Sequence, residues 1–165
     1  MKKQGFTLIE LMVVIVIMGI LAAVAVPKLF GMIAKSKASE VGPAAGTYVK
    51  LQQAYISEAV KVGDWGIIGY KGPGEADATT PKLKSATTNF EYSDGGSYTD
   101  SKAELGETAI KGWSAKNLAK LNDCAITADN WKVEVKKATG SEGDAEFTAT
   151  TNCTDLTPNF DKIGK

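Results

Sequence analysis

The stretch GFTLIELMVVIVIMGILAAVAVP, residues 5–27, decides how the rest of this 165-residue chain is interpreted. Sixteen consecutive uncharged residues run from Leu11 to Val26. The 21 residues from Phe6 to Val26 would span about 31 Å as an α-helix, close to the thickness of a bilayer core. The sequence therefore predicts an N-terminal helix that is long and apolar enough to cross a membrane.

One carboxylate, Glu10, lies near the start of this apolar stretch. An unpaired charge in hydrocarbon costs roughly 2–3 kcal/mol or more. A carboxylate near a helix N-terminus meets the favourable end of the helix dipole, which offsets part of that cost. We therefore expect Glu10 either to pair with a positive charge or to lie at the headgroup boundary.

A cleavable secretory signal is one interpretation of this N-terminus. Ala22, Ala23 and Ala25 permit a cut near Ala25. Such signals have a shorter apolar core that ends in a polar stretch, however. Here the apolar run is longer, and from Lys28 onward the helical pattern continues without a break. These features disfavour cleavage near Ala25.

The order of residues at the N-terminus resembles that of type IV pilins and their relatives. A short basic leader, MKKQG, ends at Gly5 and is followed by Phe6, by TLIE at residues 7–10, by the apolar run and by Pro27. The resemblance is detailed over roughly the first 30 residues. It implies the pilin fold, an α+β structure in which a long N-terminal α-helix with a hydrophobic first half packs on a small antiparallel β-sheet head.

The resemblance also implies roles for three residues. A membrane aspartyl peptidase, the prepilin peptidase, would cut between Gly5 and Phe6 and methylate the new amine of Phe6. In a growing fibre, Glu10 would neutralise the Phe6 amine of a neighbouring copy. Two charges are tolerated in an apolar core only as a pair, so this contact would penalise a wrong register. A Glu10 that merely snorkels to the interface remains the simpler alternative.

The helix is expected to continue past the apolar run. Pro27 lacks an N–H group, so a kink is expected there. The resemblance to type IV pilins implies that the stretch from Gly19 to Pro27 would loosen when the subunit leaves lipid. Gly42 and Pro43 mark a second weak point. The domains expected are a leader (1–5), a transmembrane or fibre-core helix (6–27), an amphipathic continuation (28–63) and a β-rich head (64–165).

The amphipathic continuation carries two adjacent apolar rows at helical spacing, which make one wide face. The first row is Ala44, Tyr48, Leu51, Tyr55 and Val62, and the second is Val41, Ala45, Val49, Ile56 and Val60. A face of this width predicts a helix that packs both on a sheet and on neighbouring subunits. Gly63 is the expected end of the helix.

Period-2 alternation identifies the clearest strand of the head, Trp131–Ala138. A turn rich in glycine follows at 140–144, so Ala145–Asn152 is expected to complete a hairpin. The other elements predicted for the head are strands at Trp65–Tyr70 and Asn89–Ser93 and a short helix at Ser114–Leu121 that Ser114 would cap.

The two cysteines, Cys124 and Cys153, are expected to form a disulfide, because an exported domain is in an oxidising compartment. Many type IV pilins carry a disulfide-bounded C-terminal region, and the placement here is similar. The spacing excludes a catalytic C-x-x-C pair. Two free thiols remain the alternative.

Composition gives little support to catalysis or to nucleic-acid binding. The 19 lysines balance 19 acidic residues, so there is no strong attraction to nucleic acid, and the chain has no histidine, the commonest general base and metal ligand. We expect no enzymatic activity, cofactor or bound metal. A calcium site is the weaker alternative, and its candidate ligands are Glu142, Asp144, Asp155 and Asp161.

The resemblance implies a structural subunit that is held in the cytoplasmic membrane and polymerises into an extracellular type IV pilus for adhesion or motility. Its partners would be copies of itself, the prepilin peptidase and the pilus assembly machinery. Two alternatives stay open. One is a pseudopilin of a type II secretion system, and the other is a membrane-anchored ligand-binding module that exposes Trp65, Tyr70 and Trp113.

Overall fold

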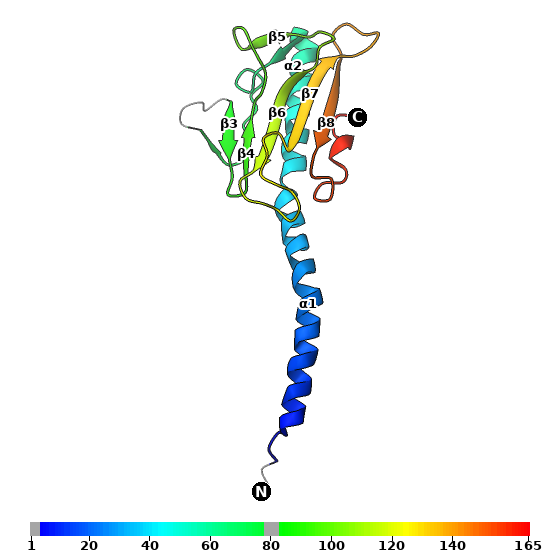
Figure 1. Cartoon of the computed structure of the whole chain (residues 1–165). Helices are drawn as coiled ribbons and strands as arrows, with labels where there is room; N and C mark the ends of the chain where they lie inside the picture. The colour runs from blue at the N-terminus through cyan, green and yellow to red at the C-terminus, as the bar shows by residue number, and fades with distance from the viewer. Residues whose placement is uncertain (1–3, 78–82) are drawn as a thin grey trace.

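The structure, a computed structural model, describes residues 4–77 and 83–165. A long helical stalk rises from the N-terminus into a head built from a β-sheet (Figure 1). The helical part consists of α1 (Leu8–Ala38) and α2 (Val41–Ala59). The head holds a six-stranded antiparallel sheet and a separate pair of strands. This arrangement confirms the expected α+β fold, with a long N-terminal helix on an antiparallel sheet.

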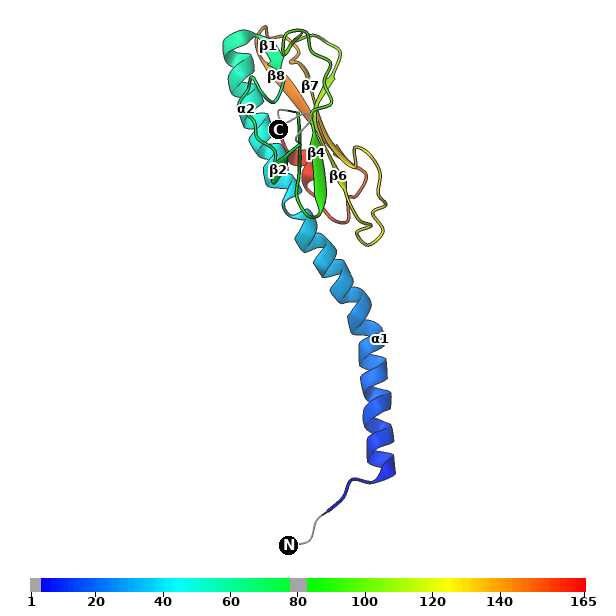
Figure 2. The same cartoon turned by 90° about the vertical axis from the view of Figure 1, so that its left-hand side faces the viewer.

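The stalk helix α1 passes through Pro27 and continues to Ala38. Figure 2 shows α1 curving along its length. A short turn at Ser39 and Glu40 separates α1 from α2, and Gly42 and Pro43 lie in the first turn of α2. Proline is tolerated in a first turn, because its missing N–H group would have no helical partner there.

Helix α2 ends earlier than the sequence suggested. Its last residue is Ala59, and Val60 adopts a left-handed conformation (φ 54°) in which its N–H donates to the carbonyl of Ile56 at 2.8 Å. The predicted end at Gly63 is therefore wrong. Gly63 closes strand β1 (Lys61–Gly63), which pairs with β5 (Lys102–Glu104), and this pairing draws the chain out of the helix.

The main sheet has the strand order β2-β3-β4-β6-β7-β8, and all neighbours are antiparallel. The predicted hairpin is confirmed as β7 and β8, with Val133 opposite Ala149. The predicted strand at 89–93 is confirmed as β4. The bounds are β2 Glu75–Ala76, β3 Lys84–Ala86, β4 Phe90–Ser93, β6 Ile110–Asn117, β7 Trp131–Lys137 and β8 Ala145–Thr151, and a 3₁₀ turn, η1, covers Phe160–Lys162.

Two predicted elements are wrong. The chain from Trp65 to Tyr70 forms a turn, closed by a hydrogen bond of 2.9 Å from the Tyr70 N–H to the Trp65 carbonyl. The predicted helix at 114–121 is largely the second half of β6. This strand is paired on both sides, with β4 and β7, and ladder hydrogen bonds to two neighbours override a local preference for helix.

The core lies between α2 and one face of the sheet (Figure 2). From α2, Tyr48 and Ile56 are fully buried, and the sheet contributes Trp113, Trp131 and other aromatic side chains. Gly112 lies against the Tyr48 hydroxyl, and a Cβ atom there would overlap it. The helix therefore packs on β6 at a position where a side chain has no room.

Candidate functional site

The N-terminal end of α1 is organised around Thr7 and Glu10. The Thr7 N–H donates to Glu10 Oε2 at 2.7 Å, and the Thr7 hydroxyl donates to the same oxygen at 2.9 Å. In return, the Glu10 N–H donates to Thr7 Oγ1 at 3.3 Å. This is a capping box, in which the two side chains satisfy backbone N–H groups that the helix leaves unpaired. Glu10 is thus held at the helix terminus, and among residues 4–77 and 83–165 it has no basic partner.

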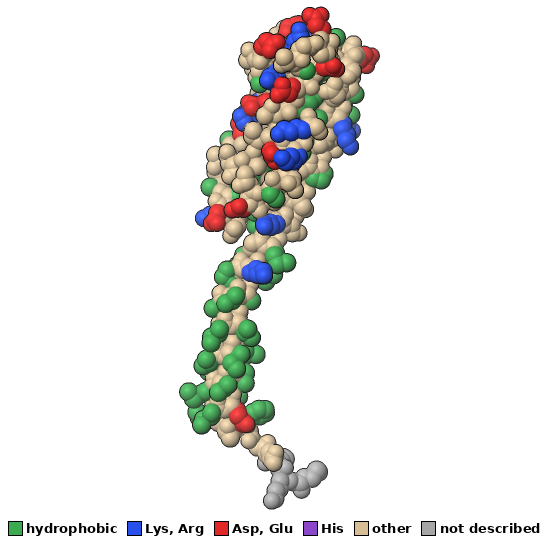
Figure 3. All heavy atoms as spheres, turned by 90° about the vertical axis from the view of Figure 1, so that its right-hand side faces the viewer, with side chains coloured by type: hydrophobic (Ala, Val, Ile, Leu, Met, Phe, Trp, Pro, Cys, Tyr) green, Lys and Arg blue, Asp and Glu red, His purple; other side chains and the backbone are tan. Residues whose placement is uncertain are grey.

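The apolar side chains of α1 are exposed along almost the whole stalk below the head (Figure 3). Phe6 is 82% exposed, Ile9 and Val24 are each 72% exposed, and Ala34 is the first buried residue. The helix is long and apolar enough to cross a membrane, with a mean hydropathy of 2.9 in its most apolar window and none of that window buried. The head folds without covering this surface.

The predicted processing site lies in an extended segment before the helix. No other residue comes within 4 Å of the position that a Cβ atom on Gly5 would occupy, and Phe6 is exposed. The leader is described only from Gln4 onward, so Met1–Lys3 lie outside the described residues. Both sides of the Gly5–Phe6 bond are open to an approaching enzyme or partner.

Glu40, at the junction between the stalk and the head, ties the helix to the sheet. Its Oε1 accepts hydrogen bonds from Thr87 Oγ1 and from the Tyr92 hydroxyl, both at 2.7 Å. Burial, followed by the neighbouring Glu40 carboxylate, raises the pKa of Tyr92, so its hydroxyl stays protonated and remains a donor. These bonds fix the point at which the stalk leaves the head.

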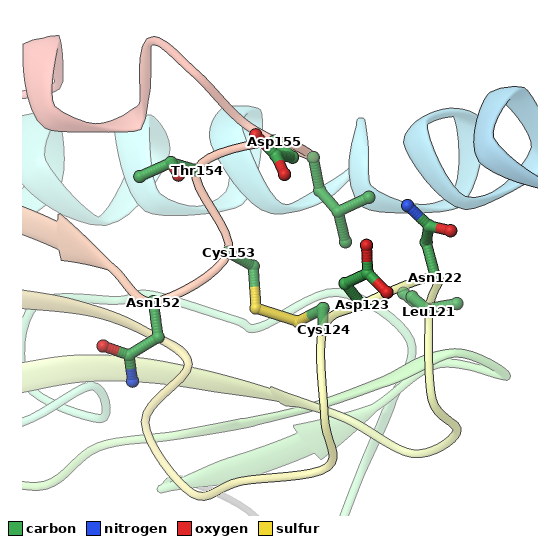
Figure 4. Close-up of a pocket in the computed structure, with 9 residues that line it drawn as sticks. Leu121, Asn122, Asp123, Cys124, Asn152, Cys153, Thr154 and Asp155 are labelled. Carbon is green, nitrogen blue, oxygen red and sulfur yellow. A yellow bond between two sulfur atoms is a disulfide. The ribbon is translucent and has the colours of Figure 1, made fainter.

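Cys124 and Cys153 form a disulfide with Cα atoms 5.5 Å apart, which confirms the expected bridge. It joins the loop between β6 and β7 to the segment that follows β8 (Figure 4). Buried Asn130 donates to Asn117 Oδ1 at 2.6 Å and to the Ala125 carbonyl at 2.7 Å. The bridge and these amides hold the loop between β6 and β7 against the sheet.

A partly buried polar group, Asp94, fastens the turn after α2 to the sheet. Its carboxylate accepts hydrogen bonds from the N–H groups of Trp65 and Gly96, both at 3.0 Å, and from the Tyr98 hydroxyl at 2.7 Å. Burial raises the pKa of Asp94 to about 6, against the opposite effect of these hydrogen bonds. All three donors belong to the same chain, so this carboxylate has a structural role: it joins the turn that contains Trp65 to the loop after β4.

The aromatic residues that might have formed a ligand surface are buried. Trp65, Tyr70 and Trp113 are 1%, 4% and 0% exposed. The Trp113 indole donates to the Tyr70 hydroxyl at 2.9 Å, and this hydroxyl donates to the Ala44 carbonyl at 3.1 Å. The expectation that these side chains are exposed is therefore wrong, because they pack α2 onto the sheet.

The four acidic residues considered for calcium do not gather into a site. Glu142 pairs with Lys137 at 3.6 Å, and Asp161 pairs with Lys162 at 3.5 Å. Asp144 accepts a hydrogen bond from the Ser141 hydroxyl at 2.6 Å. Within residues 4–77 and 83–165, no group of three or more His, Cys, Asp or Glu side chains is placed to hold a metal ion.

The fold and this site define a class of α+β protein. Its members have an exposed apolar N-terminal helix with a carboxylate in a capping box at its start. Residues 1–26 match the family model described as the prokaryotic N-terminal methylation motif. The match covers the leader, Phe6, the capping box and the apolar run. The resemblance to type IV pilins is thereby confirmed for the N-terminal part of the chain.

Curated relatives point the same way. The chain is 41% identical over 64 residues to the type IV major pilin protein PilA of Myxococcus xanthus, covering 39% of this chain and 29% of that protein. It is 36% identical over 89 residues to the type IV major fimbrial protein FimA of Dichelobacter nodosus, covering 52% and 56%. With the fimbrial protein EcpC of Eikenella corrodens the identity is 46% over 56 residues, covering 34% and 37%. The chain thus spans less than two thirds of each of these relatives.

Three contacts at these sites were not predicted from the sequence. The capping box could have been predicted from the sequence, because Thr7-x-x-Glu10 has the required spacing before an apolar run. Buried Gln52 pairs with Gly63, donating to its carbonyl at 3.1 Å and accepting from its N–H at 2.9 Å once the amide is oriented to satisfy both. Neither this pair nor the role of Glu40 has a local signal, because both depend on how the chain folds back.

Proposed function

We propose that the chain is a structural subunit of a type IV pilus and polymerises through its N-terminal helix into an extracellular filament. The observation that carries the proposal is the exposed apolar surface of α1, which the head leaves uncovered from Phe6 to Ile33. Apolar area in water costs roughly 25 cal/mol per Å². A bilayer before assembly, and copies of the same helix afterwards, would remove this surface from water.

Processing at the Gly5–Phe6 bond is the first step of the proposal. The prepilin peptidase would remove the leader and methylate the amine of Phe6. The matched methylation motif and the open, extended segment around this bond support the assignment. Cleavage also removes Lys2 and Lys3 and leaves a single new positive charge four residues before Glu10.

Glu10 would set the register of assembly. The capping box keeps its carboxylate at the helix terminus, close to the end of the chain where the new amine arises. In a fibre core without water, the carboxylate of one copy and the Phe6 amine of its neighbour would be tolerated only as a pair, because each lone charge is costly to desolvate. A copy docked one turn out of place would leave both charges unpaired.

The proposal assigns a role to each segment of the chain, from the N-terminus to the C-terminus. Residues 1–5 form the leader, 6–27 the segment that moves from membrane to fibre core, 28–63 the amphipathic continuation and 64–165 the head that coats the fibre. Gly19 and Pro27 bound the stretch that would loosen when the helix leaves lipid. The precursor would cross the cytoplasmic membrane once, and the pilus assembly machinery would transfer it to the cell surface.

Two observations favour this function over its rivals. The relatives are named as major pilins and fimbrial proteins, which favours a pilin over a pseudopilin. The burial of Trp65, Tyr70 and Trp113 removes the support for an anchored ligand-binding module. The absence of enzymatic activity, of a cofactor and of nucleic-acid binding stays a prediction.

A mass spectrum of non-reduced protein from sheared surface material tests the proposal. We expect an abundant chain that begins at methylated Phe6 and is two hydrogens lighter than the reduced form, because of the Cys124–Cys153 bridge. A chain found only in membranes, starting at Met1 or near Ala25, would contradict the proposal.

A further inference from the structure

Three lysines surround α1 directly below the head: Lys28 and Lys35, seven residues apart, lie on one side of the helix, and Lys37 lies on the opposite side. Lys28, Lys35 and Lys37 are exposed, and none of them takes part in an ion pair among the residues that the structure describes. They follow the apolar run, and exposed Phe30 and Met32 lie among them. We call residues 28–37 the basic collar. It presents both positive charge and apolar surface that nothing in the same chain covers.

The opposite end of the molecule has the complementary character. Residues 38–165 contain 18 of the 19 acidic residues but 14 of the 19 lysines, which gives a net charge of −4. Acidic side chains gather at the end of the head farthest from the stalk (Figure 3). Glu58, Asp100 and Glu107 are exposed there and are not in ion pairs among the described residues. Val60, beside Glu58, is 50% exposed and adds apolar surface.

Contacts within the head bring these three acids to one end although they are far apart in sequence. Glu58 belongs to the last turn of α2, which leads into β1. Asp100 precedes β5, the partner of β1, and the Asp64 N–H donates to the Ser101 carbonyl at 2.9 Å. Glu107 follows β5, and the Lys137 N–H donates to the adjacent Gly106 carbonyl at 2.8 Å. We call this end the acidic crown.

We propose that the basic collar of one copy docks on the acidic crown of another copy in the fibre. This inference rests on the proposed function and names a second contact between subunits, distant from Glu10. Charge complementarity and matching apolar surface on the two faces carry it. Parallel copies with a common axis bring the two faces together if they are offset by the distance between collar and crown.

The length of the helix sets that offset. From Lys35 to Glu58 there are 23 residues, and at about 1.5 Å per residue the two lie about 35 Å apart along the axis. From Lys28 the separation is about 45 Å by the same rise. The contact therefore joins copies whose offset along the fibre axis is far larger than the single helical turn between Phe6 and Glu10. It would not compete with the contact between Glu10 and its immediate neighbour.

Anionic lipid headgroups are the other partner that three lysines beside an apolar helix fit. They would explain the collar but would give no role to the acidic crown, which lies tens of ångströms from the bilayer. The copy-to-copy contact uses both faces, so the observations favour it. The lipid contact is one of the outcomes that the experiment distinguishes.

The test compares fibre yield in sheared surface material from cells that make full-length variants. In the collar variant, Lys28, Lys35 and Lys37 are each replaced by Gln. The matched control replaces Lys71, Lys84 and Lys120 by Gln, three exposed head lysines that are also unpaired among the described residues. Three exposed ion pairs at about 0.5 kcal/mol each correspond to a yield about tenfold lower for the collar variant. The control should assemble like the unchanged chain.

A charge exchange gives the sharper result. Lys35→Glu with Lys37→Glu should reduce the yield, and adding Glu58→Lys with Glu107→Lys to the same chain should restore most of it. Tryptophan fluorescence checks that the head is folded, because all three tryptophans belong to it. Equal yield from the collar variant and the unchanged chain would overturn the inference.

Failure of the exchange would also overturn it, and the collar would be assigned to lipid if the collar variant is retained less than the unchanged chain on phosphatidylglycerol vesicles but equally on phosphatidylcholine vesicles. If the unchanged chain forms no fibre, the proposed function fails as well. A fibre that forms but ignores the collar refutes this inference alone.

Discussion

The stalk and the head differ in the exposure of their apolar side chains, which are exposed in the stalk and buried in the head. In the head, Trp113, Trp131 and Tyr48 are fully buried between α2 and the sheet. In the stalk, side chains such as Ile9 and Val24 are mostly exposed on every side of α1. One chain thus contains a self-sufficient core and a helix whose apolar surface requires another molecule. Under the proposed function, the hydrophobicity of the stalk serves association, whereas that of the head serves folding.

Polar groups show the same division. Across the outward face of the sheet, lysines pair with acids within the same chain, as in Lys116–Glu91 at 3.0 Å and Lys136–Glu146 at 3.2 Å. In the part of the stalk that the structure describes, Glu10 bonds to Thr7 in its own capping box, and the lysines of the basic collar have no ion-pair partner. Changes in the stalk should therefore affect assembly, whereas changes to the buried or paired groups of the head should affect stability.

Replacing Glu10 should give the largest effect. Removing one member of a buried pair costs about 3–5 kcal/mol, so Glu10→Gln is expected to lower fibre yield at least about a hundredfold. The head should be unaffected, because Glu10 contacts only Thr7. Shearing followed by quantitative immunoblotting of the surface and membrane fractions measures the effect. Glu75→Gln, an exposed carboxylate on β2, is the matched control, and equal losses in both variants would contradict the role of Glu10.

Removing the disulfide should give the largest effect on the head. Closing a loop of 29 residues contributes roughly 3–4 kcal/mol in the chain-entropy model. Replacing Cys124 and Cys153 together by Ser is expected to lower the free energy of unfolding by this amount. Denaturant unfolding of the full chain in micelles, followed by tryptophan fluorescence, reports on the head alone. A double variant as stable as the unchanged chain would show that the buried amides hold the loop without the bridge.

Gly112→Ala should lower stability by about 1–3 kcal/mol, a typical cost of overpacking. The added Cβ would overlap the Tyr48 hydroxyl, so α2 must move away from β6. Gly106→Ala is the matched control, because the position of a Cβ atom there is open. The same unfolding measurement compares the two variants. If both lose the same free energy, the close approach of α2 to β6 is not what Gly112 provides.

Asp94 should give a smaller effect that depends on pH. Folding raises its pKa from about 3.8 to about 6, so the folded state binds the proton more tightly. Its contribution to stability is fully present below pH 3.8 and is lost as pH rises through about 6. We expect the free energy of unfolding to increase by about 1–2 kcal/mol from this group as pH falls from 7 to 4.

The measurement is the difference between the unchanged chain and Asp94→Asn across this pH range. Other carboxylates in the head oppose the trend, since hydrogen bonding and the charge of Lys111 lower the pKa of Asp129 in spite of its partial burial. The difference between the two chains removes that background. A difference that does not change with pH would show that Asp94 keeps an ordinary pKa in the folded head.

The fold could be predicted where the signal is local and periodic. The apolar run beginning at Phe6 indicated the helix, alternation from Trp131 indicated β7, and the turn at 140–144 indicated the hairpin. It could not be predicted where a distant partner decides. Residues 114–117 have a helix-compatible composition but lie in the middle of the sheet. Residues 65–70 suggested a strand, yet the rings of Trp65 and Tyr70 pack edge to face, with centroids 4.7 Å apart, in a turn that Asp94 holds.

The candidate site divides in the same way. The roles of Gly5, Phe6 and Glu10 were predicted from a compact motif and stay predictions. The Cys124–Cys153 bridge was predicted from two cysteines in a chain expected to be exported, and the structure confirms it. The part played by Glu40 could not be found, because Thr87 and Tyr92 reach it only after β3 and β4 have folded. Local motifs therefore predict the candidate functional residues. The contacts that support them, such as those of Glu40, depend on how the sheet folds.

A cryo-electron microscopy reconstruction of the sheared fibre tests the central claim most directly. We predict a core of α1 helices enclosed by heads, with the Glu10 carboxylate of each copy within ion-pair distance of the Phe6 amine of a neighbour. Apolar side chains from Phe6 to Ile33 should be buried between copies. Fibres in which α1 lies outside the core, or in which Glu10 and the neighbouring amine are far apart, would contradict this account of the chain.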